Sequence, residues 1–307
     1  MKDMRRWITS RMSPDLAWAR ALVRLFGSRH GVNVQFEKDI IAVRKKQGEI
    51  RIPLAKFPYV QDMILHFDTY YTTVEPDERG IVDYSAPKVH RLRESGISFH
   101  LPSIAEEVEA IDDYFRWYQP KQGDLVFDLG AHAGVSTYFL SKAVGPEGRV
   151  IAFEPDPVAW ASLTKNIADL EMSNVQAIQK AVAGERGRLA FQAEGSLGSA
   201  LASVSSRPGQ HTVMVDAITF SDACEAAGGA PTFVKMDIEG AELEVISAAQ
   251  GYLRGKQINF AADTNHTLGG ELTSTRLENL FREVGYDAQS SAQTGFMTTW
   301  ARGLSRS

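Results

Sequence analysis

The strongest constraint on the fold is the alternation of strand and helix patterns that begins at Gly123. Short, continuous apolar runs are typical of strands buried in a parallel sheet, and parallel strands need a long crossover between them, usually a helix. The alternation therefore predicts an α/β fold with a doubly wound, mostly parallel sheet, which binds its ligand outside the carboxyl ends of the first strands. The expected strands are 124–130, 149–154, 174–182, 231–240 and 258–263, the expected helices are 134–144, 157–170, 240–250 and 272–284, and YDAQSSA with GFMTTWAR is expected as a closing antiparallel pair.

The first hundred residues have a different pattern. Residues 14–27 predict a helix with Gly27 as its cap, residues 32–54 read as short strands, and further helical pattern lies in 57–75 and 104–118. We therefore expect a smaller N-terminal α/β region, residues 1–103, for accessory or substrate-docking roles, and a catalytic domain over residues 104–307. The apolar residues of the first helix fall on one stripe formed by Leu16, Trp18, Ala21, Leu22, Leu25 and Phe26.

Charge is distributed unevenly along the chain. The formal net charge is -5, yet residues 1–56 hold 13 Lys/Arg against 5 Asp/Glu, and the later part of the chain is acidic. The basic segment 1–56 either forms a solvated face or attracts an acidic partner such as nucleic acid or an acidic peptide. Cys224 is the single cysteine, and neither a secretory signal nor an apolar run of about 18 residues occurs, so we expect a cytoplasmic protein with no membrane partner.

A glycine turn follows the first strand of the expected sheet. In Asp128-Leu-Gly130-Ala-His132-Ala-Gly134 the strand stops, the glycines allow a tight turn, and backbone N–H groups at a helix start suit a carboxylate or phosphate. Asp128 is placed to orient a ligand's ammonium group. The chain contains no Gly-x-Gly, so the dinucleotide fingerprint is missing, and the P-loop is missing as well. The turn is therefore expected to hold something other than a pyrophosphate.

Acidic residues also end the second and fourth strands. Glu154 follows the second strand, where a carboxylate can accept hydrogen bonds from both hydroxyls of a ribose. Asp237 and Glu239 follow the fourth strand in KMDIEGAE. Because the carboxyl ends of parallel strands share one edge of the sheet, these groups are expected near the reacting centre.

Four segments together resemble the FkbM-type methyltransferase family, and the resemblance spans roughly residues 104–302. It implies a Rossmann-like class I methyltransferase sheet, S-adenosylmethionine as cofactor, and methylation of a hydroxyl or a side-chain amide nitrogen of a natural product, glycan or peptide. The segments are GDLVFDLGAHAG (123–134), RVIAFEPDP (149–157), NVQAIQKAVAGERG (174–187) and KMDIEGAE (235–242), with IDDYF (111–115) as a fitting lead-in.

The resemblance also implies roles for individual residues. It puts Glu154 on the ribose, while Ala181 borders the adenine or belongs to the core. His132 either touches a ligand or lies on the surface. The residues expected around the methionine half of the cofactor are Asp128, Gly130 and Gly134, with Ser136 either reaching its carboxylate or capping the helix start.

Methyl transfer is an in-line displacement that needs an oriented acceptor and, for an alcohol or amide, removal of a proton. The candidate bases are Asp237, Glu239 and His266. Oxygen donors at Asp237, Asp263 and Asn265 form a possible but disfavoured Mg²⁺ set, and no Cys/His cluster for zinc exists.

Several functions stay open at this point. A peptide-directed N-methyltransferase would use the N-terminal region to dock a leader, while the same region is otherwise an oligomerisation surface in a homodimer. A non-catalytic protein that binds the cofactor or a partner is the alternative from another class. Nucleic acid is disfavoured as substrate because the basic residues lie outside the catalytic domain. A nicotinamide oxidoreductase and a serine hydrolase are disfavoured because their glycine motifs are missing.

Overall fold

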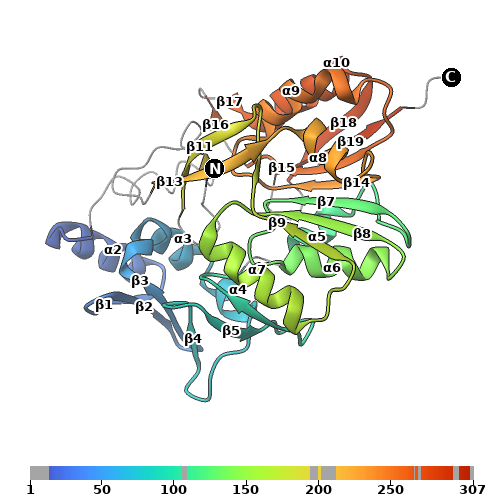
Figure 1. Ribbon diagram of the computed structural model, residues 1–307. Helices are drawn as coiled ribbons and strands as arrows, with labels where there is room; N and C mark the ends of the chain where they lie inside the picture. Colours follow the sequence, from blue (N-terminus) through green and yellow to red (C-terminus); the bar gives the residue numbers. More distant parts are fainter. Residues whose placement is uncertain are drawn as a thin grey trace. The chain divides into compact units, whose positions relative to one another are not determined.

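The computed structural model describes residues 14–105, 109–193, 200–201, 212–265, 267–268, 271–292 and 297–304. Contacts within the chain divide it into two compact units, Met1–Glu107 and Val108–Ser307 (Figure 1). Among the described residues, no helix is both long and apolar enough to cross a membrane.

The N-terminal unit is built on a four-stranded sheet in the order β1-β2-β3-β4. The first three strands are antiparallel and β4 pairs parallel to β3. The predicted helical stretch over 57–75 is broken at His66, where the backbone leaves helical geometry. The elements are α2 (Ala17–Arg29), β1 (Asn33–Phe36), β2 (Ile40–Lys45), β3 (Gly48–Pro53), η1 (Leu54–Tyr59), α3 (Val60–Leu65), α4 (Phe67–Thr72), β4 (Ile81–Asp83), β5 (Lys88–Arg91) and β6 (Ser98–Leu101).

Helix α2 packs on its unit through small side chains. Ala19, Val23 and Gly27 are its buried residues. Gly27 was expected to cap the helix, and this was wrong, since α2 continues to Arg29. A Cβ at Gly27 would lie 2.8 Å from the Val32 carbonyl oxygen, so the glycine is needed for close packing inside the helix. The larger apolar side chains of the stripe stay largely in solvent.

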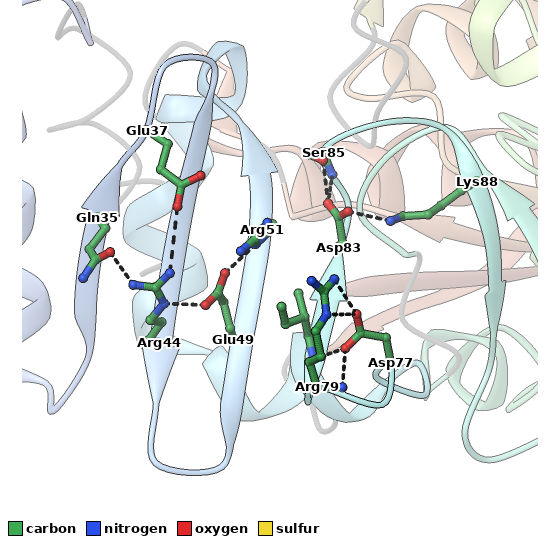
Figure 2. A network of polar contacts seen from close by, with 11 residues as sticks. Gln35, Glu37, Arg44, Glu49, Arg51, Asp77, Arg79, Asp83, Ser85 and Lys88 are labelled. Atoms are coloured by element: carbon green, nitrogen blue, oxygen red, sulfur yellow. Dashed lines mark hydrogen bonds and ion pairs between the residues drawn. The ribbon is translucent and has the colours of Figure 1, made fainter.

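Ion pairs lie within and between the strands of the N-terminal unit (Figure 2). Arg44 and Arg51 both contact the carboxylate of Glu49, and Lys88 lies 2.6 Å from Asp83. The side chains are partly exposed, so each pair contributes at most about 1 kcal/mol to stability. Much of the basic charge in β2 and β3 is therefore neutralised within the unit.

The C-terminal unit contains a seven-stranded sheet in the order β18-β19-β15-β14-β7-β8-β9. Six of the seven strands run in the same direction, and β19 runs antiparallel to both of its neighbours, so the predicted fold class and closing pair are confirmed. The order reverses between β7 and β14, which is the switch point at which such sheets bind ligands. The strands are β7 (Leu125–Leu129), β8 (Arg149–Phe153), β9 (Val175–Ile178), β14 (Phe233–Met236), β15 (Asn259–Asp263), β18 (Tyr286–Ser291) and β19 (Thr298–Gly303).

Helices cover both faces of this sheet (Figure 1). Phe127 points toward α8, α9 and α10, while Val126 points toward α5 and α6. Asp128 therefore shares the face of Val126, because side chains alternate along a strand. The helices are α5 (Glu109–Tyr114), α6 (Val135–Val144), α7 (Pro157–Asp169), α8 (Phe220–Ala226), α9 (Glu242–Leu253) and α10 (Thr273–Glu283).

A second sheet, in the order β10-β13-β11-β12, was not predicted. The expected strand over 174–182 is wrong as one element, because β9 ends at Ile178 and Ala181 pairs with Ala217 of β13 instead of with β8. The Ser/Gly-rich segment 195–210 lies outside the described residues except for 200–201. The remaining strands are β10 (Ala181–Val182), β11 (Gly187–Gln192), β12 (Ala200–Leu201), β13 (Thr212–Ile218), β16 (Thr267–Leu268) and β17 (Glu271–Leu272).

Candidate functional site

The ends of β7 and β14 meet at the switch point of the main sheet. The backbone N–H of Asp237 donates to the Leu129 carbonyl at 2.9 Å. Gly130 has a φ of 77°, and a Cβ there would lie 1.8 Å from the carbonyl oxygen of Asp237. Glycine is therefore required at this position by the approach of the β14 loop, before any ligand is considered.

Asp128 is fully buried beneath the turn. Its Oδ2 accepts hydrogen bonds from the hydroxyls of Ser136 at 2.9 Å and Thr137 at 2.6 Å. These contacts tie the end of β7 to the first turn of α6. From sequence, Ser136 was expected either to reach a cofactor carboxylate or to cap the helix start, and in the structure its hydroxyl donates to Asp128.

Lys235 balances the buried charge of Asp128. Its Nζ lies 3.3 Å from Asp128 Oδ1 and donates to the Gly130 carbonyl at 2.7 Å, and its side chain is 1% exposed. In the strand register Lys235 faces Asp128 directly across β7 and β14. The ammonium thus holds both the carboxylate and the turn, a role that sequence reasoning missed. A buried charge of this kind is tolerated only when it is paired.

Gly134 begins α6 with a φ of 86°. A Cβ at this position would lie 2.7 Å from Leu163 Cδ1 of α7. The second glycine of the turn therefore lets α6 start close against α7, and Asn166 of α7 donates to the Ala133 carbonyl at 2.7 Å. The turn is fixed from both sides.

Glu154 lies at the end of β8 and is 5% exposed. Its Oε2 accepts from the backbone N–H of His132 at 2.7 Å, and its Oε1 accepts from that of Asp156 at 2.7 Å. Burial raises the pKa of this carboxyl to about 8. His132 has a φ of 48°, which aims its N–H at Glu154, and the residue is buried rather than on the surface. Glu154 therefore joins the glycine turn to the end of the second strand.

Asp237 follows β14 and is only half-buried. The hydroxyl of Tyr114 lies 3.5 Å from Asp237 Oδ2, and the Tyr114 ring lies 5.7 Å from Lys235 Nζ. Helix α5 is held there because Trp300 donates from its indole nitrogen to the Asp113 carbonyl at 2.7 Å. Tyr114 was not singled out from sequence, although IDDYF was noted as a segment.

The loop after Asp237 is held by a buried acid. Glu242 accepts from the backbone N–H of Ile238 at 3.0 Å and is fully buried. Glu239 is half-buried and has a φ of 56°, an uncommon backbone conformation for a residue with a side chain. Asp237 and Glu239 thus follow the same strand in a tightly shaped loop.

The possible metal donors Asp263, the last residue of β15, and Asn265 bond to neighbouring groups of the chain. Asp263 accepts from the backbone N–H of Asn265 at 2.8 Å and from its amide nitrogen at 3.1 Å. The amide oxygen of Asn265 accepts from the Met297 N–H at 2.6 Å. Within the described ranges, no group of three His, Cys, Asp or Glu is arranged to hold a metal ion. His266 lies outside the described residues.

Ala181 lies in β10 of the second sheet. It is buried in an apolar cluster with Phe191 and Ala217. The structure therefore places Ala181 in a small core that packs against Ile238 of the β14 loop.

Comparison with known proteins identifies the family. The model of the FkbM methyltransferase domain matches residues 128–288. No curated protein matches the chain.

Solved structures resemble the chain at low identity. An FkbM methyltransferase from Methylobacillus flagellatus is 18% identical with a TM-score of 0.42, over 81% of this chain and 54% of its own. A precorrin-6y C5,15-methyltransferase from Geobacter metallireducens is 13% identical with a TM-score of 0.44, over 70% of this chain and 97% of its own. Aeropyrum pernix fibrillarin, in complex with natively bound S-adenosyl-L-methionine, is 13% identical with a TM-score of 0.41, over 88% of this chain and 98% of its own.

The family match covers just over half of the chain and includes the ends of β7, β8 and β14. The chain belongs to the FkbM methyltransferase domain family.

Proposed function

We propose that this chain transfers a methyl group from S-adenosylmethionine to a hydroxyl or a side-chain amide nitrogen of a natural product, glycan or peptide. The observation that carries the proposal is the meeting of the Gly130 turn, Glu154 and Asp237 at the switch point of the sheet. This is the edge at which doubly wound sheets bind ligands. Family membership supports the same reaction class.

The residues at the ends of β7 and β8 fit the proposed cofactor. Each oxygen of Glu154 already accepts one backbone N–H, and each retains a lone pair that suits a ribose hydroxyl. The turn from Gly130 to Gly134 would hold the methionine half, above the Asp128–Lys235 pair. When bound, S-adenosylmethionine supplies an electrophilic methyl group on a sulfonium sulfur.

Asp237 is our candidate for the group that orients the acceptor and takes its proton. It follows β14, is half-exposed and lies beside the Tyr114 hydroxyl, whereas Asp128 and Glu154 are deeply buried. A base must reach the acceptor's proton directly or through one water, which a half-exposed carboxylate can do. Glu239 and His266 stay secondary candidates for the same task.

Calorimetric titration with S-adenosylmethionine and then S-adenosylhomocysteine tests the cofactor assignment. We expect micromolar binding of both by the full chain. Failure of a folded sample to bind either one would favour the non-catalytic alternative. Acceptor screening with peptides and glycans follows if binding is found.

Asp237→Asn separates binding from chemistry. We expect cofactor affinity to change less than threefold and product formation to fall at least a hundredfold, the range typical of a general base. Asp287→Asn is the matched control, because Asp287 pairs with Arg302 on the surface of the same unit. Turnover retained by Asp237→Asn would remove Asp237 from the mechanism.

A further inference from the structure

Aromatic side chains of α5 and of the residues that follow it pack along β14. The rings of Phe115 and Tyr118 lie 6.1 and 5.9 Å from the Phe233 ring, centre to centre. The ring of Tyr114, four residues before Tyr118, has its centre 5.7 Å from Lys235 Nζ. Phe233 and Lys235 are two residues apart in one strand, so their side chains share a face of the sheet. The aromatic segment therefore covers β14 from Phe233 toward its carboxyl end, where the candidate site lies.

The residues on either side of Tyr114 are anchored to β19. Trp300 donates from its indole nitrogen to the Asp113 carbonyl at 2.7 Å, and the carboxylate of Asp113 lies 2.8 Å from the guanidinium of Arg116. Trp117 stacks on Trp300 with ring centres 6.3 Å apart and an angle of 20° between the planes. Tyr114 itself is buried. Because its neighbours on both sides are fixed, the hydroxyl of Tyr114 has a defined place beside the end of β14.

The hydroxyl of Tyr114 contacts the carboxylate of Asp237. It lies 3.5 Å from Asp237 Oδ2, and Tyr114 is buried whereas Asp237 is half-buried. This distance is long for a hydrogen bond, but hydrogen bonds that serve catalysis are often long in the free enzyme and shorten when substrate binds. A carboxylate has about four lone-pair positions, so one donor at Oδ2 leaves Asp237 able to accept a proton. The contact can therefore orient Asp237 without blocking it as a base.

We propose that Tyr114 is a positioning residue that acts through Asp237, its hydroxyl holding the carboxylate in the orientation that meets the acceptor. This role rests on the proposed function, in which Asp237 takes the acceptor's proton. The ring and the hydroxyl have separate tasks. The ring lies over the Lys235 ammonium that balances Asp128, and the hydroxyl contacts the base. A base that is oriented before the acceptor binds needs less reorganisation to reach the reactive geometry.

Tyr114→Phe removes the hydroxyl and keeps the ring over Lys235, and Tyr118→Phe is the matched control. The hydroxyl of Tyr118 also donates to a carboxylate, that of Asp124 at 2.8 Å. Chemical denaturation of the full chain gives the first readout, which needs no acceptor. The changes in unfolding free energy caused by Tyr114→Phe and Asp237→Asn should not add in the double variant, whereas those of Tyr118→Phe and Asp237→Asn should add. Additivity in both pairs would overturn the contact and the proposal with it.

Turnover gives the second readout, with the peptide or glycan on which the wild-type chain forms product. Tyr114→Phe is expected to lower kcat about tenfold, the order of one hydrogen bond to a charged group, and to leave the KM for S-adenosylmethionine within twofold. It should have no further effect in an Asp237→Asn background, and Tyr118→Phe should keep the wild-type kcat. An equal loss of kcat in both backgrounds would show that Tyr114 does not act through Asp237.

Calorimetric titration with S-adenosylmethionine separates this proposal from the proposed function. We expect Tyr114→Phe and Tyr118→Phe to bind the cofactor as the wild type does, because neither hydroxyl is assigned to it. A folded wild-type chain that binds no S-adenosylmethionine would contradict the proposed function itself. A wild-type chain that binds it, combined with additive changes for Tyr114→Phe and Asp237→Asn, would contradict only the role of Tyr114.

Discussion

Two buried acids lie at the ends of neighbouring strands, Asp128 in β7 and Glu154 just after β8, and they have different partners. Asp128 has two hydroxyls and a buried ammonium as partners, while the oxygens of Glu154 accept from backbone N–H groups. Burial dominates at Glu154 and raises its pKa to about 8. An acid with its own cation thus stabilises the framework, whereas an acid held only by backbone amides has a raised pKa and a charge that a ligand or a change in pH can alter.

Lys235→Met should have the largest effect, because it leaves Asp128 buried without its cation. Removing one partner of a buried pair costs about 3–5 kcal/mol of unfolding free energy. Chemical denaturation of the variant measures the loss. Adding Asp128→Asn should restore part of the stability, since the remaining charge is then removed. A double variant no more stable than Lys235→Met alone would show that the ammonium acts mainly through the Gly130 carbonyl.

Gly130→Ala introduces a steric clash at the end of β7. Its Cβ would meet the Asp237 carbonyl at 1.8 Å in a left-handed backbone, and we expect a cost of about 2–4 kcal/mol. Gly123→Ala is the matched control: its φ is 86°, but nothing lies within 4 Å of the added Cβ, so about 1 kcal/mol is expected. Equal losses from thermal denaturation of the two variants would contradict the close approach of the β14 loop.

The raised pKa of Glu154 makes the stability of the fold depend on pH. Glu154 has a folded pKa near 8 and an ordinary value of 4.5, so between these pH values unfolding releases a proton. Stability therefore falls as pH rises through this window, by up to about 1.4 kcal/mol per pH unit. Unfolding free energies from pH 5 to 8 should show a shallower decline in Glu154→Gln than in the wild type. If the unfolding free energies of the two proteins changed equally with pH, Glu154 would not be the group responsible for the decline.

The smallest expected effect concerns cofactor affinity. Glu154→Ala should weaken S-adenosylmethionine binding about tenfold, or ~1.4 kcal/mol, the order of one charge-assisted hydrogen bond. Wild-type affinity should rise with pH toward 8, since the ribose hydroxyls donate to a carboxylate. Titration calorimetry at pH 6.5 and 8.5 checks both statements, with Asp169→Ala at the exposed end of α7 as control. If Glu154→Ala left the affinity for S-adenosylmethionine unchanged, the assignment of Glu154 to the ribose hydroxyls would be wrong.

Sequence alone predicted the main sheet because its strands are short apolar runs bounded by helices, as in the segments around Phe127 and Phe260. The second sheet was missed because β10 and β12 have only two residues each, and because β13 lies between β10 and β11, an order that does not follow the sequence. Local pattern does not give such pairings.

In the candidate site, too, some residues can be identified from the sequence and others only from the tertiary structure. The acids at strand ends could be singled out from their positions in the sequence, although their roles stay proposals. Lys235 reads as an ordinary surface lysine until the strand register puts Asp128 beside it. Tyr114 and Asp237 are separated by 123 residues, so their contact follows from the packing of α5 against the sheet. Only tertiary structure supplies these neighbours.

The position of β19 has a consequence for how the chain acquires its fold. This strand lies between β15 and β18, although it is the last of the seven to be synthesised. The gap beside β15 therefore stays open until residue 303 has left the ribosome. Pairing across such sequence separations slows folding and leaves strand edges exposed in the meantime. Until β19 has been synthesised, the edge of β15 that it covers lacks its partner strand, and an unpaired strand edge is a template for association with other chains.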